Sequence, residues 1–452
     1  MSDAADRLIQ HVMTVKWETA SSSARQSAVT FLHDSLAVGI AGKNERLADT
    51  VFEQARLWSG EDGSSLVLGR PGQRLKAPYA AFVNAYQIHC QEFDCVHEPA
   101  VAHPMATVGA ALLAEAGRSG PVTGERFLES VIVGVDIVAA LGVAVQGSLK
   151  FFRPATAGIF GSVAGLAKLR GLSHEVTKTA FGHALSFASG TMQAHVEGKP
   201  TLALQVAGAS RSAVEAVDLA VAGFPSPDGS IDGPFGYLSL FESDVVLAPV
   251  LDELPKRSRI AEVSWKPFPT GRAAHGAIVA MQALMEKQGL TADSLSRFTY
   301  RAPPLIHRLV GRRPKAGMSV NYARLCFAWL GANVLLNGKV SLEDFSDENL
   351  NDPIRLELAD RIHVETDGSQ DWAAFAPATG IAELNDGREL REEVAKQFGA
   401  PEWPLTREQH LEKATQCLTF GGQADRAEAL ARLMTNFDKL DDVHEALAGA
   451  LD

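Results

Sequence analysis

The chain has 452 residues and a formal net charge of −12, with 46% hydrophobic and 21% charged residues. This composition is typical of a folded protein with a sizeable core, and the length predicts two domains. The acidic charge, without any Lys/Arg-rich run, argues against a nucleic-acid partner and means that an anionic substrate needs a local cluster of cations.

Cysteine usage and hydropathy together indicate a reducing, aqueous compartment. The four cysteines, Cys90, Cys95, Cys326 and Cys417, form no CxxC pattern. The N-terminus lacks the apolar core of a signal peptide, and the most apolar stretch, VIVGVDIVAALGVAV from Val131, is too short to span a bilayer. We therefore expect a cytoplasmic protein that has no membrane partner.

Helical signals run almost without interruption from the N-terminus to about residue 225. Ser21–Ser23 supply candidate N-caps for a helix that closes near Gly42. Thr123 precedes a second helix, with Glu125 in the first turn, where the helix dipole favours an anion. Small residues crowd the stretches ATAGIFGSVAGLAKL and FGHALSFASG, so the sequence predicts helices that pack closely in an all-helical core.

Strand signals appear only after Pro249. RFTYRAP and RIHVETD are short β-rich runs, and GIAELNDGRELREEV carries Asp386–Gly387 between two strand-like segments, which predicts a hairpin. A helix from roughly Tyr322 to Asn337 is expected among them, and the tail from PLTREQHLEKATQCL onward is helical again.

These patterns predict a mostly α fold with two domains. Residues 1–260 and 396–452 form a large all-helical domain, built from both chain ends, and residues 261–395 form an inserted α+β lid domain. Clefts between domains are common ligand sites, so side chains near the boundaries are candidates for function.

The segment HCQEFDCVHEPAVAHPM, His89–Met105, concentrates polar groups in a loop that two prolines separate from the following helix. Three interpretations fit it. Asp94, His97 and His103 could bind a metal together with Cys95, although the spacing matches no standard zinc pattern. The histidines could instead satisfy a buried turn. Acid/base catalysis or substrate contact is the interpretation that we favour.

Two further stretches carry polar residues in apolar surroundings. FFRPATAGIFG places Arg153 at a helix start, where a guanidinium would suit a carboxylate, although a surface arginine is the plainer interpretation. QAHVEGKPTLALQVAGASR contains Glu197, Lys199, Gln205 and Arg211. These residues line a cavity or face solvent at helix ends.

A third stretch, WKPFPTGRAAHGAIVAM, brings Lys266, Arg272 and His275 to the domain boundary. They predict an anion-binding corner, with an ordinary linker as the alternative. The sequence contains no GxGxxG after a strand, no P-loop and no GxSxG elbow, so nucleotide-dependent and serine-hydrolase chemistry are both unsupported.

Taken in order, these stretches resemble the MmgE/PrpD family over nearly the whole chain. EFDCVHEPAVAHP resembles the family's D-[FY]-D-D-T-H…H-P run, and NYARLCFAWLGANVLLNGKVSLEDF resembles its A-[KR]-F-S-L-P-Y…LLDG-x-V-x-L-x-x-F run. FRPATAGIFGSVAGLAKLRGLS, EGKPTLALQVAGASR and WKPFPTGRAAH follow in register. The resemblance implies a helical domain plus an α+β lid, a homodimer, and an active site in the cleft between the domains. It also implies chemistry on small di- or tricarboxylates without a metal or organic cofactor.

The sequence departs from the family pattern at several positions. Cys95 and Val96 replace an aspartate and a threonine, and Glu92 replaces another aspartate. Arg153 stands where the family often has histidine, and Leu202 stands where a substrate-binding lysine is expected, with Lys199 three residues earlier. Cys326 and Trp329 occupy positions that usually hold serine and tyrosine in the family. The retained residues are Asp94, His103, Gln205, Arg211, Lys266, Arg272 and His275. Fold transfers more safely than reaction across such differences.

The resemblance implies proton transfer next to a carboxylate, where nearby cations stabilise the charge that develops. We predict a cofactor-independent hydro-lyase that acts on a polycarboxylate of the 2-methylcitrate type. Asp94 and His103 form its acid/base pair, and His97 is a second candidate. The predicted substrate-binding residues are Arg153, Lys199, Gln205, Lys266, Arg272 and His275. An epimerase or isomerase, a decarboxylase, and a non-catalytic protein that kept the fold are the alternatives.

Overall fold

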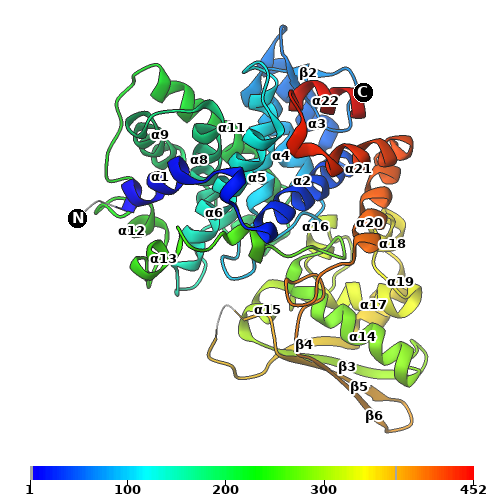
Figure 1. Cartoon of the computed structure of the whole chain (residues 1–452). Helices are drawn as coiled ribbons and strands as arrows, with labels where there is room; N and C mark the ends of the chain where they lie inside the picture. Colours follow the sequence, from blue (N-terminus) through cyan, green and yellow to red (C-terminus); the bar gives the residue numbers. More distant parts are fainter. Residues whose placement is uncertain (1–3, 372–373) are drawn as a thin grey trace.

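The computed structural model describes residues 4–371 and 374–452. In Figure 1 helices fill the upper body, whereas strands β3 (Leu295–Ala302) to β6 (Glu389–Val394) lie at the lower end with α14 (His275–Gln288) and α17 (Phe327–Asn337). The first and last helices of the described chain, α1 (Ala4–Thr14) and α22 (Val443–Leu451), belong to the helical body, and α20 (Arg407–Phe420) leads the chain back to it from the sheet. The expected mostly helical architecture, with a small sheet in the C-terminal region, is confirmed.

The helical body is formed mainly by residues 4–253 and 407–452. Its helices are α1 (Ala4–Thr14), α2 (Ser22–Gly42), α3 (Ala48–Ser59), α4 (Ala77–His89), α5 (Pro104–Ala116), α6 (Gly124–Val143), α7 (Arg153–Thr156), α8 (Gly158–Arg170), α9 (His174–Phe187), α10 (Gln193–Glu197), α11 (Thr201–Val221), α12 (Tyr237–Phe241), α13 (Ala248–Glu253), α20 (Arg407–Phe420), α21 (Ala427–Thr435) and α22 (Val443–Leu451). A short antiparallel pair, β1 (Ser65–Leu66) and β2 (Arg74–Leu75), was not expected.

Local sequence explains where these helices begin and how closely they pack. Ser21 caps α2 by accepting a hydrogen bond from the Ala24 amide, and Thr123 caps α6, as predicted. A Cβ on Gly161 of α8 would come within 2.5 Å of the Gly134 carbonyl of α6, so only glycine allows this crossing. No helix in the described part of the chain has the length and apolar character that a bilayer crossing requires.

The inserted segment folds around a mixed four-stranded sheet in the order β4-β3-β5-β6. Its strands are β3 (Leu295–Ala302), β4 (Ile362–Thr366), β5 (Ala378–Leu384) and β6 (Glu389–Val394), and its helices are α14 (His275–Gln288), α15 (Pro304–Val310), α16 (Val320–Ala323), α17 (Phe327–Asn337), α18 (Asp347–Leu350) and α19 (Pro353–Asp360). The β3–β4 pair is parallel and the other two pairs are antiparallel. Gly387, with φ 86°, turns the predicted β5–β6 hairpin.

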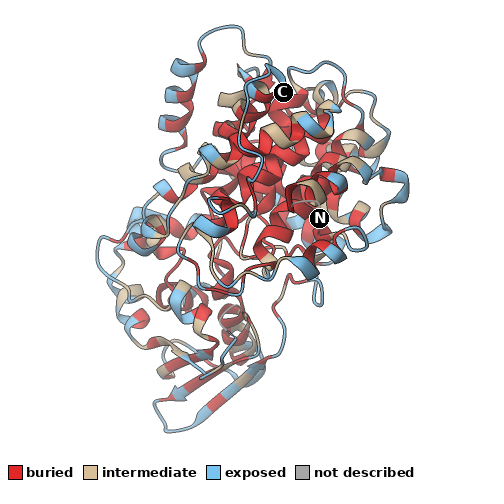
Figure 2. Ribbon diagram, turned by 90° about the vertical axis from the view of Figure 1, so that its left-hand side faces the viewer, coloured by how far each residue is buried: buried red, intermediate tan, exposed pale blue. Residues whose placement is uncertain are grey.

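Each part has its own hydrophobic cluster. One cluster draws almost entirely on residues 4–263 and 414–451, and the other draws on residues 268–394. Figure 2 shows the buried residues concentrated inside the helical body and between the sheet and its helices. The strand β6 alternates buried and exposed side chains, as expected for a sheet that has helices on one face and solvent on the other.

One predicted element differs from the structure. The helix expected from Tyr322 to Asn337 is interrupted, because α16 ends at Ala323 and α17 begins only at Phe327. The carbonyl of Arg324 accepts a hydrogen bond from the Gly271 amide, and Cys326 forms a bridge with Gly311. These contacts with neighbouring segments hold the backbone out of the helix.

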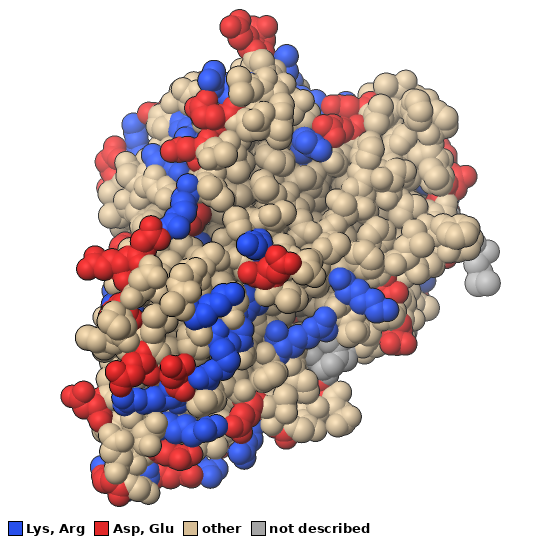
Figure 3. All heavy atoms as spheres, turned by 180° about the vertical axis from the view of Figure 1, so that it is seen from behind, with Lys and Arg blue, Asp and Glu red and all other residues tan. Residues whose placement is uncertain are grey.

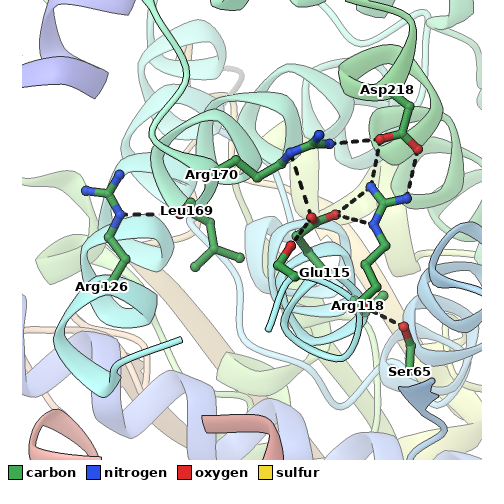
Figure 4. A network of polar contacts seen from close by, with 9 residues as sticks. Ser65, Glu115, Arg118, Arg126, Leu169, Arg170 and Asp218 are labelled. Carbon is green, nitrogen blue, oxygen red and sulfur yellow. Dashed lines mark hydrogen bonds and ion pairs between the residues drawn. The ribbon is translucent and has the colours of Figure 1, made fainter. Parts of the chain in front are cut away.

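A polar network anchors the far end of α5, the helix whose first turn adjoins the candidate site. Arg118 donates hydrogen bonds to Glu115 of α5 and to both carboxylate oxygens of Asp218 on α11 (Figure 4). Arg170, at the end of α8, also pairs with Asp218 at 2.8 Å. Three helices are thereby fixed relative to one another, which holds α5 in place along its length.

Candidate active site

The polar loop predicted from the sequence joins α4 to α5 and is almost completely buried. His89 is the last residue of α4, and His103 is the N-cap of α5, which starts at Pro104. Glu92 and Val101 have positive φ angles of 52° and 48°, an uncommon conformation for residues other than glycine. Such backbone strain is often found where a loop holds functional side chains.

Asp94 lies between two histidines at the centre of this loop. Its carboxylate is 3.2 Å from Nδ1 of His89 and 3.1 Å from Nδ1 of His103. A carboxylate only accepts hydrogen bonds, so both rings donate from Nδ1. The Nε2 atom of His103 has no hydrogen-bond partner in the described chain, and it therefore presents its lone pair. We call His89, Asp94 and His103 the His–Asp–His triad.

The electrostatics of the triad favour an ionised aspartate and a neutral His103. Burial alone would raise the pKa of Asp94, but His103 and His89 outweigh it and hold the pKa well below its usual range. Burial would lower the pKa of His89, yet Asp94 and Glu92 raise it. At His103 burial prevails and the pKa is lowered. The His103 ring is therefore ready to accept a proton at neutral pH.

His103 opens into a narrow cavity of about 70 Å³ between the helical body and the inserted segment. Its walls are mainly apolar, with Phe152 and Leu202 on one side and Leu309 and Phe375 on the other. The polar residues that line it are Glu92, His103, Arg153, His195 and Arg272. An apolar cavity with a few convergent polar groups is the usual form of a small-molecule site.

Every predicted cation near this cavity already has a carboxylate partner. Arg153 donates to both oxygens of Glu242, at 2.9 and 3.0 Å. The other two pairs are Lys266 with Glu92, at 2.7 Å, and Arg272 with Glu98, at 2.7 Å. Buried cations require such partners, because an unpaired charge is costly in a low dielectric. The predicted cations therefore lie at the site, but none is free to bind a carboxylate without rearrangement.

The remaining predicted residues lie outside the cavity. His97 is held in the loop itself, since its Nδ1 accepts from the Ala100 amide and its Nε2 lies 3.1 Å from Glu262. This geometry matches the buried-turn interpretation for that one histidine. His275 is fully buried behind Arg272, with Nδ1 3.1 Å from the guanidinium.

Lys199 and Gln205 do not approach the triad either. Gln205 uses its amide on the backbone of Thr191, accepting from N–H at 2.6 Å and donating to the carbonyl at 3.2 Å. Lys199 is exposed and does not line the cavity. Leu202 does line it, so the position where the family pattern has lysine contributes an apolar wall.

Sequence reasoning missed four residues that shape the site. His89 is the first residue of the quoted motif and lies five positions before Asp94, but the sequence pattern did not predict its contact with that carboxylate. Glu98 and Glu242 neutralise Arg272 and Arg153 across 174 and 89 residues, respectively. His195, which lines the cavity, lies in the stretch QAHVEGKPTLALQVAGASR, but the pattern did not single it out.

The triad also satisfies the distance requirement of a metal site. One ligand atom from each of its three residues lies within 4.8 Å of the others. Two imidazoles and a carboxylate are a ligand set that zinc accepts. However, both Nδ1 atoms already contact the carboxylate at 3.1–3.2 Å, so the three side chains satisfy one another without an ion. Direct proton transfer therefore fits this arrangement, and metal removal is a sharp test of it.

Comparison with known proteins agrees with the resemblance seen in the motifs. Residues 6–247 match the MmgE/PrpD N-terminal domain, and residues 268–439 match the MmgE/PrpD C-terminal domain. The chain belongs to the MmgE/PrpD family. This membership supports the coarse expectation of a family enzyme acting on carboxylates and leaves the reaction to the site.

Three curated relatives align over more than nine-tenths of the chain. Cis-aconitate decarboxylase from Homo sapiens is 27% identical, over 92% of this chain and 88% of its own length. The Mus musculus protein of the same name is 28% identical, over 91% and 85%. A cis-aconitate decarboxylase-like protein from Aspergillus oryzae is 26% identical, over 94% and 92%.

Proposed function

We propose that the protein is a cofactor-independent lyase acting on a small di- or tricarboxylate, with His103 transferring the proton next to a carboxylate. The observation that carries this proposal is the unpartnered Nε2 of His103, whose ring is fixed by Asp94 and lines a narrow, mainly apolar cavity. A base held in one tautomer by a buried carboxylate is an established way to activate imidazole.

Dehydration fits this geometry best. His103 removes the proton from the carbon beside the carboxylate and becomes an imidazolium paired with Asp94. The negative charge moves onto the carboxylate as an enolate, and the β-hydroxyl then leaves as the same imidazolium returns its proton. The products are an alkene and water, and His103 is neutral again. Proton transfer by one positioned side chain typically contributes about 10²–10⁴-fold to the rate.

A second imidazole supports the departure of the hydroxyl. His195 lines the cavity, and burial together with Arg312 lowers its pKa to about 4. Its Nδ1 lies 3.4 Å from the Arg312 guanidinium, which can only donate, so the proton of neutral His195 is on Nε2. That N–H is a suitable donor to the oxygen of the leaving group.

Positive charge that is not neutralised lies beside the cavity. Arg308 and Arg312 have no carboxylate partner in the described chain, and they donate to the backbone carbonyls of Leu149 and His195, two lining residues. Figure 3 shows Lys and Arg side chains gathered over the middle and lower part of the rear face. An acidic protein thereby concentrates local positive charge, which attracts polycarboxylates.

Decarboxylation is the second candidate, because two of the relatives are named cis-aconitate decarboxylase and the third is named a cis-aconitate decarboxylase-like protein. In this reaction the carboxylate leaves as CO₂, and protonated His103 delivers a proton to the carbon that is left with the electron pair. Water then restores the proton on His103. The same site thus serves either reaction, but the two reactions require opposite starting protonation states of one residue.

Proton NMR in D₂O tests the proposal with citrate, 2-methylcitrate, cis-aconitate and substituted succinates. New olefinic signals, or hydration of an alkene, establish a hydro-lyase, and loss of one carboxyl group establishes a decarboxylase. Deuterium exchange with an unchanged skeleton indicates an epimerase. His103→Asn should abolish the reaction, whereas His174→Gln, at the half-buried start of α9 and outside the cavity, should leave it intact. No turnover across the panel would contradict the proposal.

A further inference from the structure

A larger hollow than the His103 cavity lies on the other side of the linker that contains Lys266. This groove has a volume of about 510 Å³ and lies between α2, α20, α21 and the linker residue Trp265. Trp17 and Trp265 provide aromatic walls, and Val29 and Met434 add apolar surface. The groove shares no lining residue with the cavity at His103.

A chain of hydrogen bonds fixes the protonation of a histidine in this groove. The Nε1–H of Trp265 donates to Nδ1 of His410 at 3.2 Å, because an indole nitrogen can only donate. Burial lowers the pKa of both His410 and His33 to about 4, so each ring is neutral at pH 7. The proton of His410 is therefore on Nε2, from which it donates to Nδ1 of His33 at 3.0 Å.

The hydrogen-bonded series Trp265–His410–His33 ends in an N–H donor that has no acceptor among the described residues. Since Nδ1 of His33 accepts, its proton is on Nε2, and that atom has no hydrogen-bond partner in the described chain. The side chain is only 4% exposed, and His33 lines the groove. This N–H donor belongs to a residue that lines the groove, where a bound ligand can accept its hydrogen bond.

The charges in the groove indicate what that acceptor is. Arg25 and Arg407 line it, and neither has a carboxylate partner within residues 4–371 and 374–452. Asp438 is the single acidic residue among the lining residues. Two arginines and a fixed N–H donor favour an anion, and guanidinium groups suit a carboxylate in particular.

We propose that this groove is a second anion-binding site, separate from the candidate active site, that takes a small carboxylate with a flat apolar body. The two tryptophans hold the apolar part, and His33, Arg25 and Arg407 bind the carboxylate. The proposal does not depend on which reaction occurs at His103.

The position of the groove connects it to the candidate active site. The amide of Trp265 donates to the Gly399 carbonyl at 2.9 Å, so the outgoing and returning linkers are joined at this point. The next residue, Lys266, pairs with Glu92 in the His103 cavity. A ligand packed on Trp265 therefore contacts the backbone segment that places this ion pair.

Isothermal titration calorimetry with 3-phenylpropionate tests the proposal, and 3-phenylpropanol is the uncharged matched ligand. We expect saturable binding of the acid, with quenching of tryptophan fluorescence, and at least tenfold weaker binding of the alcohol. The double variant Arg25→Met/Arg407→Met should weaken acid binding at least tenfold. Arg432→Met, an exposed arginine of α21 outside the groove, is the matched control and should bind normally.

Four outcomes would overturn this assignment. They are no saturable binding of the acid by the wild-type protein, equal binding of the acid and the alcohol, unchanged binding in the arginine double variant, and loss of binding in His103→Asn. The last outcome would place the probe in the His103 cavity. Neither arginine has an ion-pair partner among the described residues, but Arg25 lies 5.8 Å over the Trp17 ring, so the unfolding temperature of the double variant is compared with that of the wild type. His33→Gln is a second variant that removes the imidazole donor.

Discussion

Replacement of Asp94 by asparagine tests the central claim about the triad. The carboxylate accepts Nδ1–H donors from both His89 and His103, whereas an asparagine amide offers only one acceptor oxygen and turns an NH₂ group toward the other ring. If that ring is His103, its stable neutral tautomer carries the proton on Nε2, and the base is lost. We expect kcat to fall by about 10²–10⁴-fold, which corresponds to about 3–5 kcal/mol of transition-state stabilisation.

The assay is the NMR turnover rate of purified Asp94→Asn against wild type on the substrate that the panel identifies. Asp136→Asn is a matched control, because Asp136 is also fully buried and lies 3.0 Å from a histidine, His11, but makes no hydrogen bond to His103. Both variants lose a buried carboxylate, so both should lose stability. Only Asp94→Asn should lose kcat beyond the loss of folded protein.

The reasoning would be refuted by an Asp94→Asn variant that keeps more than a third of the wild-type kcat. It would also be refuted if Asp136→Asn lost as much activity per folded molecule, because the effect would then reflect general destabilisation. Circular dichroism and a denaturant titration on both variants separate these cases.

Three further predictions follow from the site and the fold. Because burial lowers the pKa of His103 from its usual value, a hydro-lyase rate should rise with pH through a midpoint on the acid side of a free histidine, and a decarboxylase rate should fall through it; a midpoint above the usual histidine value would contradict this assignment. Dialysis against EDTA should leave activity unchanged. If activity were lost and then restored by added Zn²⁺, the triad would be a metal site instead. Gly124→Ala should lower the free energy of unfolding by about 1–3 kcal/mol in a denaturant titration, because the added Cβ would lie 1.6 Å from the Phe437 carbonyl oxygen. Gly208→Ala is the control and should not destabilise the protein, because its added Cβ would meet no neighbouring atom within 4 Å.

The fold was predictable wherever local signals and burial agree. The caps at Ser21 and Thr123 and the turn at Gly387 depend on neighbouring residues alone, and all three lie where the pattern placed them. The break after Ala323 was not predictable, because it depends on a hydrogen bond to Gly271 from a distant segment. Local helix propensity yields to such contacts when they are made in the core.

The candidate site was predictable in its residue types but not in its pairing. Asp94 and His103 are close in sequence and meet in the structure, as the motif indicated. Arg153 was predicted to bind a carboxylate of the substrate. No residue near it in the sequence indicates its ion pair with Glu242. Long-range partners of this kind decide whether a buried arginine is available, and one sequence does not contain that information.

The contact of Gly124 with the chain end constrains the order in which the molecule is completed during synthesis. The Gly124 amide donates to the Leu440 carbonyl at 2.8 Å, and α20 and α21 pack against α2. The ribosome delivers these partners more than 300 residues apart, whereas the cluster of residues 268–394 is contiguous. The inserted unit can therefore finish folding on the nascent chain, while the helical body keeps an open apolar face until the last helices emerge. Truncation near the C-terminus should consequently destabilise the N-terminal helices, such as α2, more than the inserted segment.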